Sequence, residues 1–71
     1  MSRVQRLLAA AGIGAEGAVI VYKPANLFYL TGFTGEGIAL LGRGGQAVIT
    51  DFRYVEQAER ECAGFAVRSV A

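Results

Sequence analysis

Residues 38–50 read Ile-Ala-Leu-Leu-Gly-Arg-Gly-Gly-Gln-Ala-Val-Ile-Thr. Two apolar runs, residues 38–41 and 47–50, are joined by the glycine-rich link of residues 42–45. A short link of this kind between two apolar runs is typical of a β-hairpin. The stretch therefore predicts two neighbouring strands, around which the rest of the chain must build a sheet.

The segments on either side predict further strands. Residues 18–22, Ala-Val-Ile-Val-Tyr, form a continuous and largely β-branched run. Such a run predicts a strand buried on both faces of a parallel or mixed sheet. Residues 65–70 place Phe65 and Val67 in alternation with other side chains, which predicts a half-buried strand.

Three helices are predicted between these strands. The first begins at the N-cap Ser2 and ends at Gly12, the second is a short helix over residues 26–31 after Pro24, and the third begins at the cap Asp51 and ends at Gly64. Their expected buried residues are Val4, Leu7, Leu8 and Ala11, then Leu27, Phe28, Tyr29 and Leu30, then Val55, Ala58 and Cys62. The order α-β-α-ββ-α-β predicts one layered α/β domain with a mixed sheet.

The composition favours a folded chain with apolar surface to spare. The 71 residues are 54% hydrophobic and 18% charged, which is too apolar for a disordered segment. A chain of this length forms only a marginal core by itself. We therefore expect apolar surface to remain after folding, to be covered by further chain or by a partner.

Several classes of function are disfavoured. The net charge is +1 without a basic stripe, so nucleic-acid binding is not expected. The apolar runs are far shorter than the ~20 residues of a membrane span, and the charged and polar N-terminus does not resemble a signal peptide. A single cysteine, Cys62, agrees with a reducing, cytoplasmic location. The absence of histidine removes Ser-His-Asp and Cys-His nucleophile arrangements and the commonest zinc sites.

Four features are better explained by structure than by chemistry. Residues 12–17 match the dinucleotide pattern G-x-G-x-x-G, but a helix precedes them and a strand follows, the reverse of the order that phosphate binding requires. The glycine-rich loop of residues 32–37 lacks the lysine of a P-loop and favours close packing against another backbone. The acids Glu56, Glu59 and Glu61 are assigned to a solvated helix face, and Cys62 to the core. No catalytic residue and no metal ligand set is expected in this chain.

Residues 51–54, Asp-Phe-Arg-Tyr, lie at a strand-to-helix junction, where α/β proteins often collect ligands. One interpretation is a helix cap with a local ion pair. The other is a ligand site in which Arg53 presents its two-pronged guanidinium to a substrate carboxylate. The residues alone favour neither interpretation.

Two blocks carry a family resemblance. Residues 29–35, Tyr-Leu-Thr-Gly-Phe-Thr-Gly, and residues 49–58, Ile-Thr-Asp-Phe-Arg-Tyr-Val-Glu-Gln-Ala, resemble the N-terminal domain of the Xaa-Pro aminopeptidase, prolidase and creatinase family. Their spacing, the opening helix and the strand before Pro24 also fit, while Glu36-Gly37 departs slightly from the family pattern. The resemblance covers essentially the whole chain.

The resemblance implies a fold and a context. The fold would be a ribonuclease-H-like α/β domain with a mixed sheet, of which residues 1–71 are only the front portion. A catalytic domain of the same polypeptide, absent from this chain, would hold two divalent metal ions, often manganese, and hydrolyse the bond before proline in a peptide substrate. The N-terminal domain would shape the substrate entrance and form homo-oligomers, with Phe33, Asp51, Arg53 and Tyr54 as candidate substrate-binding residues.

Two functions remain open at this point. The chain is either the non-catalytic front segment of an Xaa-Pro metallopeptidase, a hydrolase, or a freestanding non-enzymatic interaction module with the same fold. In both cases the 71-residue chain alone is expected to be inactive as a peptidase.

Overall fold

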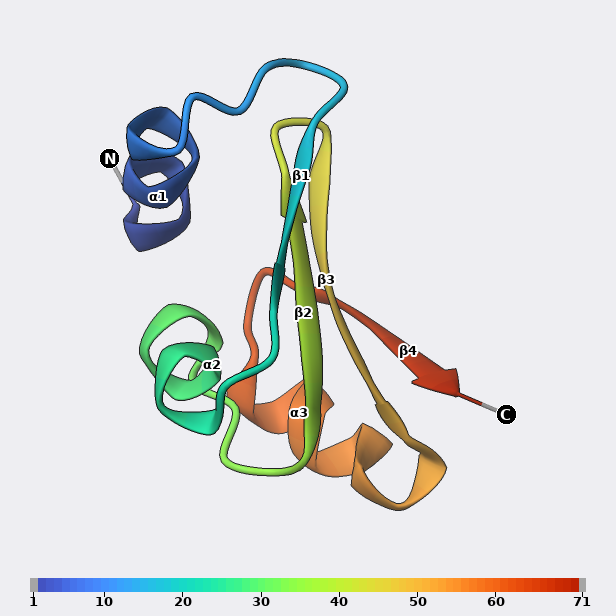
Figure 1. Ribbon diagram of the computed structural model, residues 1–71. Coiled ribbons are helices and arrows are strands. Elements are labelled where there is room, and N and C mark those ends of the chain that lie inside the picture. Colours follow the sequence, from blue (N-terminus) through green and yellow to red (C-terminus); the bar gives the residue numbers. More distant parts are fainter. Residues whose placement is uncertain (1, 71) are drawn as a thin grey trace.

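The computed structural model describes residues 2–70 and contains the predicted order of elements (Figure 1). The elements, in chain order, are α1 (Arg3–Ala10), β1 (Ala18–Val21), α2 (Pro24–Thr31), β2 (Gly37–Gly42), β3 (Gly45–Asp51), the 3-10 helix η1 (Phe52–Tyr54), α3 (Val55–Glu61) and β4 (Ala66–Val70). The α/β class is thereby confirmed.

The helix starts follow from local chemistry. Ser2 Oγ accepts from the Gln5 amide at 3.1 Å, and Gln5 Oε1 accepts from the Ser2 amide at 3.0 Å, which forms a capping box. The second helix begins at Pro24, two positions earlier than predicted (26 − 24), because proline lacks an amide and has a φ suited to the first helical turn. This helix ends at Gly32, whose φ is +82°.

The sheet is mixed, as expected. Its strand order is β1-β2-β3-β4, with β1–β2 and β2–β3 antiparallel and β3–β4 parallel. The β2–β3 hairpin turns over Arg43 and Gly44, between the paired residues Gly42 and Gly45. This confirms the hairpin that residues 38–50 predict.

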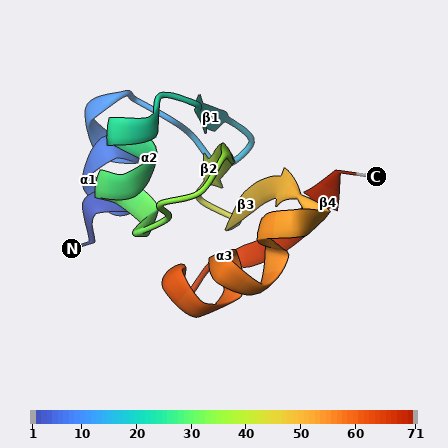
Figure 2. The same cartoon turned by 90° about the horizontal axis from the view of Figure 1, so that it is seen from below.

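All three helices lie on one face of the sheet. In Figure 2, α1 and α2 lie beside β1 and β2, while α3 lies beside β3 and β4 on the same side. The sheet residues at the centre of this covered face are buried, whereas Val67 is half-buried and Ser69 is exposed. The core also includes Val4, Leu8, Leu27 and Ala58 from the helices and Cys62, which directly follows α3. The core residues from the sheet are Val21, Ala39, Leu41 and Val48.

The prediction that residues 18–22 are buried on both faces is wrong for this chain. β1 lies at an edge of the sheet, Ile20 is 60% exposed, and Tyr22 is exposed beyond the strand end. The same one-sided arrangement corrects the second helix, where Leu27 is buried but Phe28 and Tyr29 are exposed. A short helix on one face of a sheet can turn only one stripe toward it.

Candidate functional site

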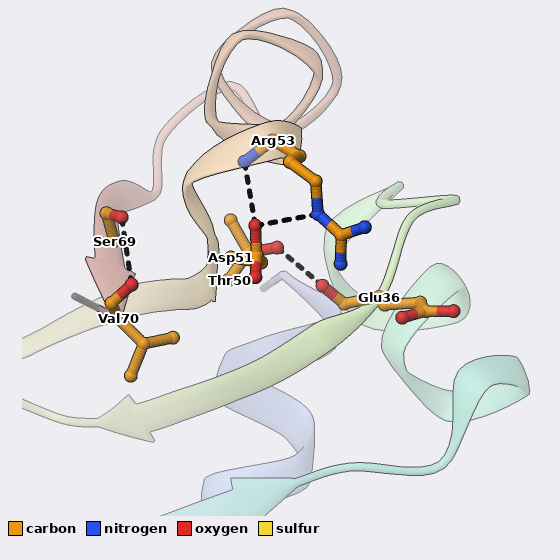
Figure 3. A network of polar contacts seen from close by, with 6 residues as sticks. All are labelled: Glu36, Thr50, Asp51, Arg53, Ser69 and Val70. Carbon is orange, nitrogen blue, oxygen red and sulfur yellow. Dashed lines mark hydrogen bonds and ion pairs between the residues drawn. The ribbon is translucent and has the colours of Figure 1, made fainter.

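Asp51 and Arg53 form the centre of the candidate site at the end of β3. Asp51 Oδ1 accepts from the Arg53 amide at 2.9 Å, which caps η1, and from Arg53 Nε at 3.0 Å (Figure 3). The carboxylate thus performs the predicted capping and also holds the arginine side chain. The geometry confirms the interpretation of a helix cap with a local ion pair. Of the guanidinium nitrogens, this ion pair uses only Nε.

These contacts shift the pKa values of both Asp51 and Arg53. The Arg53 amide, and then its side chain, lower the pKa of Asp51 below its ordinary value. The Asp51 carboxylate in turn raises the pKa of Arg53, so both groups are charged at neutral pH. Since the two side chains are 64% and 41% exposed, the pair adds little to stability.

The two Nη atoms of Arg53 are available for a ligand. Within residues 2–70 they donate no hydrogen bond, because Asp51 engages only Nε and the main-chain amide. The Asp51–Arg53 pair lies at the end of the sheet where β2, β3 and β4 come together. There, Gly37 at the start of β2 pairs with Thr50, and Asp51 pairs with Val70 at the end of β4. Thr50 Oγ1 donates to the Glu36 carbonyl and fixes the loop beside the arginine (Figure 3).

Phe33 and Tyr54 support this corner from within. Phe33 is only 1% exposed, so it belongs to the core and its predicted role cannot be direct contact in this conformation. Tyr54 is half-buried, and its ring lies 5.6 Å from Arg53 Cζ. Ring atoms of Phe33 and Tyr54 lie 2.6 Å and 3.1 Å from where a Cβ on Gly35 would stand. Glycine at this position lets both rings pack against the loop.

A second polar cluster, which the sequence did not predict, ties the glycine-rich loop to α3. Glu61 Oε1 accepts from the Thr34 amide at 2.8 Å, and both carboxylate oxygens accept from Thr34 Oγ1. Gln57 Nε2 donates to Thr34 Oγ1 at 2.8 Å. These bonds, the one from the Thr34 amide first, lower the pKa of Glu61.

The assignment of Glu61 to a solvated helix face is therefore wrong, whereas Glu56 and Glu59 are exposed as predicted. The interpretation of residues 32–37 as a closely packed loop is confirmed at Gly32, where a Cβ would stand 2.9 Å from the Glu61 carbonyl oxygen.

The remaining motifs take their predicted structural roles. Residues 12–17 connect α1 to β1 through a turn in which Gly12 has φ +69°, the reversed order that disfavours a nucleotide site. Cys62 is buried, and burial raises the pKa of its thiol, as expected of an inert core cysteine.

Neither a metal-binding cluster nor a membrane-spanning helix occurs within residues 2–70. Residues 2–70 hold no group of three or more His, Cys, Asp or Glu that could bind a metal ion. The divalent ions that the resemblance implies therefore do not fit this part of the chain. None of the described helices is both long and apolar enough to cross a membrane.

Two surface features lie outside the predicted site residues. Phe52 is 71% exposed beside Asp51, and the only sequence signal for it is its place within the junction block. A groove of about 590 Å³ runs between α1, α2 and β1, and includes Leu7, Val19 and Tyr29 in its lining. This groove includes none of the residues of the Asp51–Arg53 corner.

Comparisons with known proteins agree on one family. The model of the creatinase/prolidase N-terminal domain matches residues 1–71. The uncharacterized peptidase YqhT of Bacillus subtilis (strain 168) is 43% identical over 56 residues, which are 78% of this chain and 16% of the relative. The Xaa-Pro dipeptidase from Bacillus anthracis superposes with a TM-score of 0.85 at 33% identity, over 96% of this chain and 19% of that chain.

A third comparison concerns an isolated domain. The N-terminal domain of the cytoplasmic peptidase PepQ from Mycobacterium tuberculosis H37Rv has a TM-score of 0.78 at 27% identity, over 94% of this chain and 52% of that chain. The chain thus spans less than a fifth of the two peptidases above and about half of this solved domain.

Proposed function

This chain belongs to the creatinase/prolidase N-terminal domain family, and from that premise we propose that it is the non-catalytic front segment of a metal-dependent Xaa-Pro peptidase. The catalytic domain, in the same polypeptide, holds two divalent ions, often manganese, and cleaves the bond before proline. The protein is cytoplasmic and assembles as a homo-oligomer. The description of related proteins as peptidases and as an Xaa-Pro dipeptidase supports this assignment.

Within this function, the Asp51–Arg53 corner lines the substrate entrance. The observation that carries the assignment is the guanidinium itself: Asp51 holds its Nε, neither Nη atom has a hydrogen-bond partner within residues 2–70, and the side chain is 64% exposed. A planar guanidinium so oriented suits a carboxylate, such as a peptide C-terminus. Tyr54 flanks this group, and Phe33 acts from beneath by fixing the loop at Gly35.

The chain supplies positioning and not bond cleavage. Its described residues offer neither a metal ligand set nor, without histidine, the usual general base. What this segment can do is bind and orient the end of a peptide, which converts binding energy into correct placement of the scissile bond.

The test is a full-length polypeptide in which this chain precedes a catalytic domain, assayed on an Xaa-Pro peptide. Loss of a charge-assisted hydrogen bond costs about 1.5–3 kcal/mol, so Arg53→Ala should lower kcat/KM roughly 10- to 100-fold, mainly through KM. Arg53→Lys should recover part of the loss. The matched control is Arg60→Ala on the exposed face of α3, which should leave kcat/KM unchanged.

Stability separates the two interpretations of Arg53. Because the ion pair with Asp51 is exposed, Arg53→Ala should change the free energy of unfolding by less than about 1 kcal/mol. Unchanged KM together with a lowered melting temperature would mean that Arg53 is structural, and the entrance assignment would be lost.

A further inference from the structure

The glycine-rich loop after α2 runs along α3 from one end of that helix to the other. At the end of α3, a Cβ on Gly32 would stand 2.9 Å from the Glu61 carbonyl oxygen. Farther along the loop, the Thr34 amide and hydroxyl donate to the Glu61 carboxylate. Gly35 then lies against the ring of Tyr54, directly before the start of α3. The loop is therefore held on α3 at both ends of the helix.

Glu36 follows in this loop, beside Arg53. Its main-chain carbonyl accepts from Thr50 Oγ1, which fixes the backbone of Glu36 against β3 (Figure 3). The Glu36 side chain is exposed, and within residues 2–70 its carboxylate forms neither a hydrogen bond nor an ion pair. Asp51 is the main cause of the raised pKa of Arg53, and the Glu36 carboxylate contributes to it. Glu36 and Arg53 are therefore within electrostatic reach of each other.

The Arg53 guanidinium has two neighbouring carboxylates and is bonded to only one of them. Asp51 Oδ1 accepts from Nε at 3.0 Å, and neither Nη atom has a hydrogen-bond partner within residues 2–70. These Nη atoms are the donors that a ligand carboxylate would engage. Because the Glu36 carboxylate lies nearby without a partner of its own, it is a competitor for the same donors.

We propose that Glu36 sets the affinity of Arg53 for a ligand carboxylate, and that the bonds between Thr34 and Glu61 keep Glu36 off the guanidinium. While the loop is held on α3, Glu36 weakens ligand binding only through repulsion between like charges. When Thr34 is released, the loop moves toward Arg53 and the Glu36 carboxylate pairs with the Nη atoms, which closes the site. Glu36 is thus a specificity-determining residue and Glu61 a positioning residue. This inference rests on the proposed function, in which Arg53 binds the carboxylate of a peptide.

The experiment is steady-state kinetics of the full-length polypeptide on two forms of one Xaa-Pro peptide, with a free and with an amidated C-terminus. Glu36→Gln removes the competing charge and should lower KM for the free-carboxylate peptide about twofold to fivefold, the usual effect of one exposed charge on another. The KM for the amidated peptide should stay unchanged, because that peptide brings no carboxylate to Arg53. The fold is not at risk in this variant, since the Glu36 side chain is exposed and makes no bond within residues 2–70.

A second set of variants tests the role of Glu61. Glu61→Ala removes the acceptor of Thr34 and should raise KM for the free-carboxylate peptide roughly threefold or more, with kcat unchanged. Adding Glu36→Gln to Glu61→Ala should return KM to the value of the unmodified protein or below it. A purely structural role of Glu61 would not be rescued in this way. The matched control is Glu59→Ala, at an exposed acid of the same helix, which should leave KM unchanged.

Nuclear magnetic resonance of Arg53 provides a measurement that needs no substrate. In the full-length polypeptide labelled with ¹⁵N-arginine, the Nε–Hε signal of Arg53 is identified by its loss in Arg53→Ala. Glu61→Ala should shift this signal, because Glu36 then pairs with the same guanidinium. In the double variant Glu36→Gln/Glu61→Ala, the signal should match that of Glu36→Gln alone.

Three results would overturn the inference. The first is a KM for the free-carboxylate peptide that Glu36→Gln leaves unchanged although Arg53→Ala raises it. The second is a Glu61→Ala variant whose KM is either unchanged or not restored by Glu36→Gln. The third is an Arg53 signal that Glu61→Ala does not shift. If Arg53→Ala itself left KM unchanged, the proposed function would fail instead, and the Arg53 signal alone would decide whether Glu61 keeps Glu36 off the guanidinium.

Discussion

Replacing Gly32 by alanine should destabilise the fold through two separable causes. Gly32 ends α2 with φ +82°, a conformation that costs a residue with a side chain about 1–2 kcal/mol. In addition, a Cβ would stand 2.9 Å from the Glu61 carbonyl oxygen, so the end of α3 would have to move. Forced displacement in a packed region costs about 1–3 kcal/mol, which gives about 2–5 kcal/mol in total.

Two other glycines serve as matched controls. Gly12 also has positive φ, at +69°, but a Cβ there would have no neighbour within 4 Å, so Gly12→Ala should cost only the backbone part, about 1–2 kcal/mol. Gly44 has neither positive φ nor a neighbour within 4 Å, and Gly44→Ala should stay within about 0.5 kcal/mol of the unmodified chain.

The assay is urea unfolding of the three variants, followed by far-UV circular dichroism and analysed with a common slope. For a domain of this size, each 1 kcal/mol also moves the melting temperature by about 4–8 °C, so thermal scans provide a second measurement. If Gly32→Ala cost no more than Gly12→Ala, the close packing of the loop against the end of α3 would be refuted. If Gly32→Ala and Gly12→Ala both matched Gly44→Ala, the left-handed conformations of Gly12 and Gly32 would be refuted.

Three further outcomes are expected. Because the pKa of Glu61 is lowered from 4.5 in the folded state, the stability that its carboxylate confers is present above that value and is lost as pH falls through the folded pKa. Glu61→Gln should therefore flatten the acid limb of a stability–pH profile. An unchanged acid limb, or equal flattening by the exposed control Glu59→Gln, would count against the contact between Glu61 and Thr34. Leu41→Ala, at a fully buried side chain, should lower the free energy of unfolding by about 2–5 kcal/mol. The neighbouring Leu40→Ala, on the face of the sheet opposite to the helices, should lower it by less than about 1 kcal/mol. Equal losses of stability in chemical denaturation would contradict the assignment of the two faces. The pure 71-residue chain should not cleave an Xaa-Pro peptide with or without manganese, and metal-dependent turnover by it would disprove the non-catalytic role.

Local signals predicted the elements well because their causes lie within a few residues. The cap at Ser2 needs only Gln5, three positions away, and the cap at Asp51 needs only the Arg53 amide, two positions away. The hairpin likewise follows from glycines that link two apolar runs. The pair of blocks around Phe33 and Asp51 was also enough to identify the family, which the match over residues 1–71 confirms.

Contacts between distant segments account for the errors. Glu61 looked like a solvated acid because its partner Thr34 lies 27 positions earlier in the chain. Whether Phe33 is exposed or buried depends on how the glycine-rich loop packs against Tyr54, which no local pattern encodes. The same limit applies to Arg53, whose type and place could be read from the sequence but whose free Nη atoms could not.

The amino-acid sequence by itself determined the order of elements, the mixed α/β class, the family and the absence of histidine chemistry, because each depends on residue type, spacing or short-range hydrogen bonds. Only the tertiary structure decided which face of each strand is covered. The apolar run of β1 predicts burial on both faces, but burial also requires neighbours, and within residues 2–70 β1 has a strand on one side and helices on one face. Hydrophobic sequence sets the tendency to be buried, while the partners available in space decide whether that tendency is met.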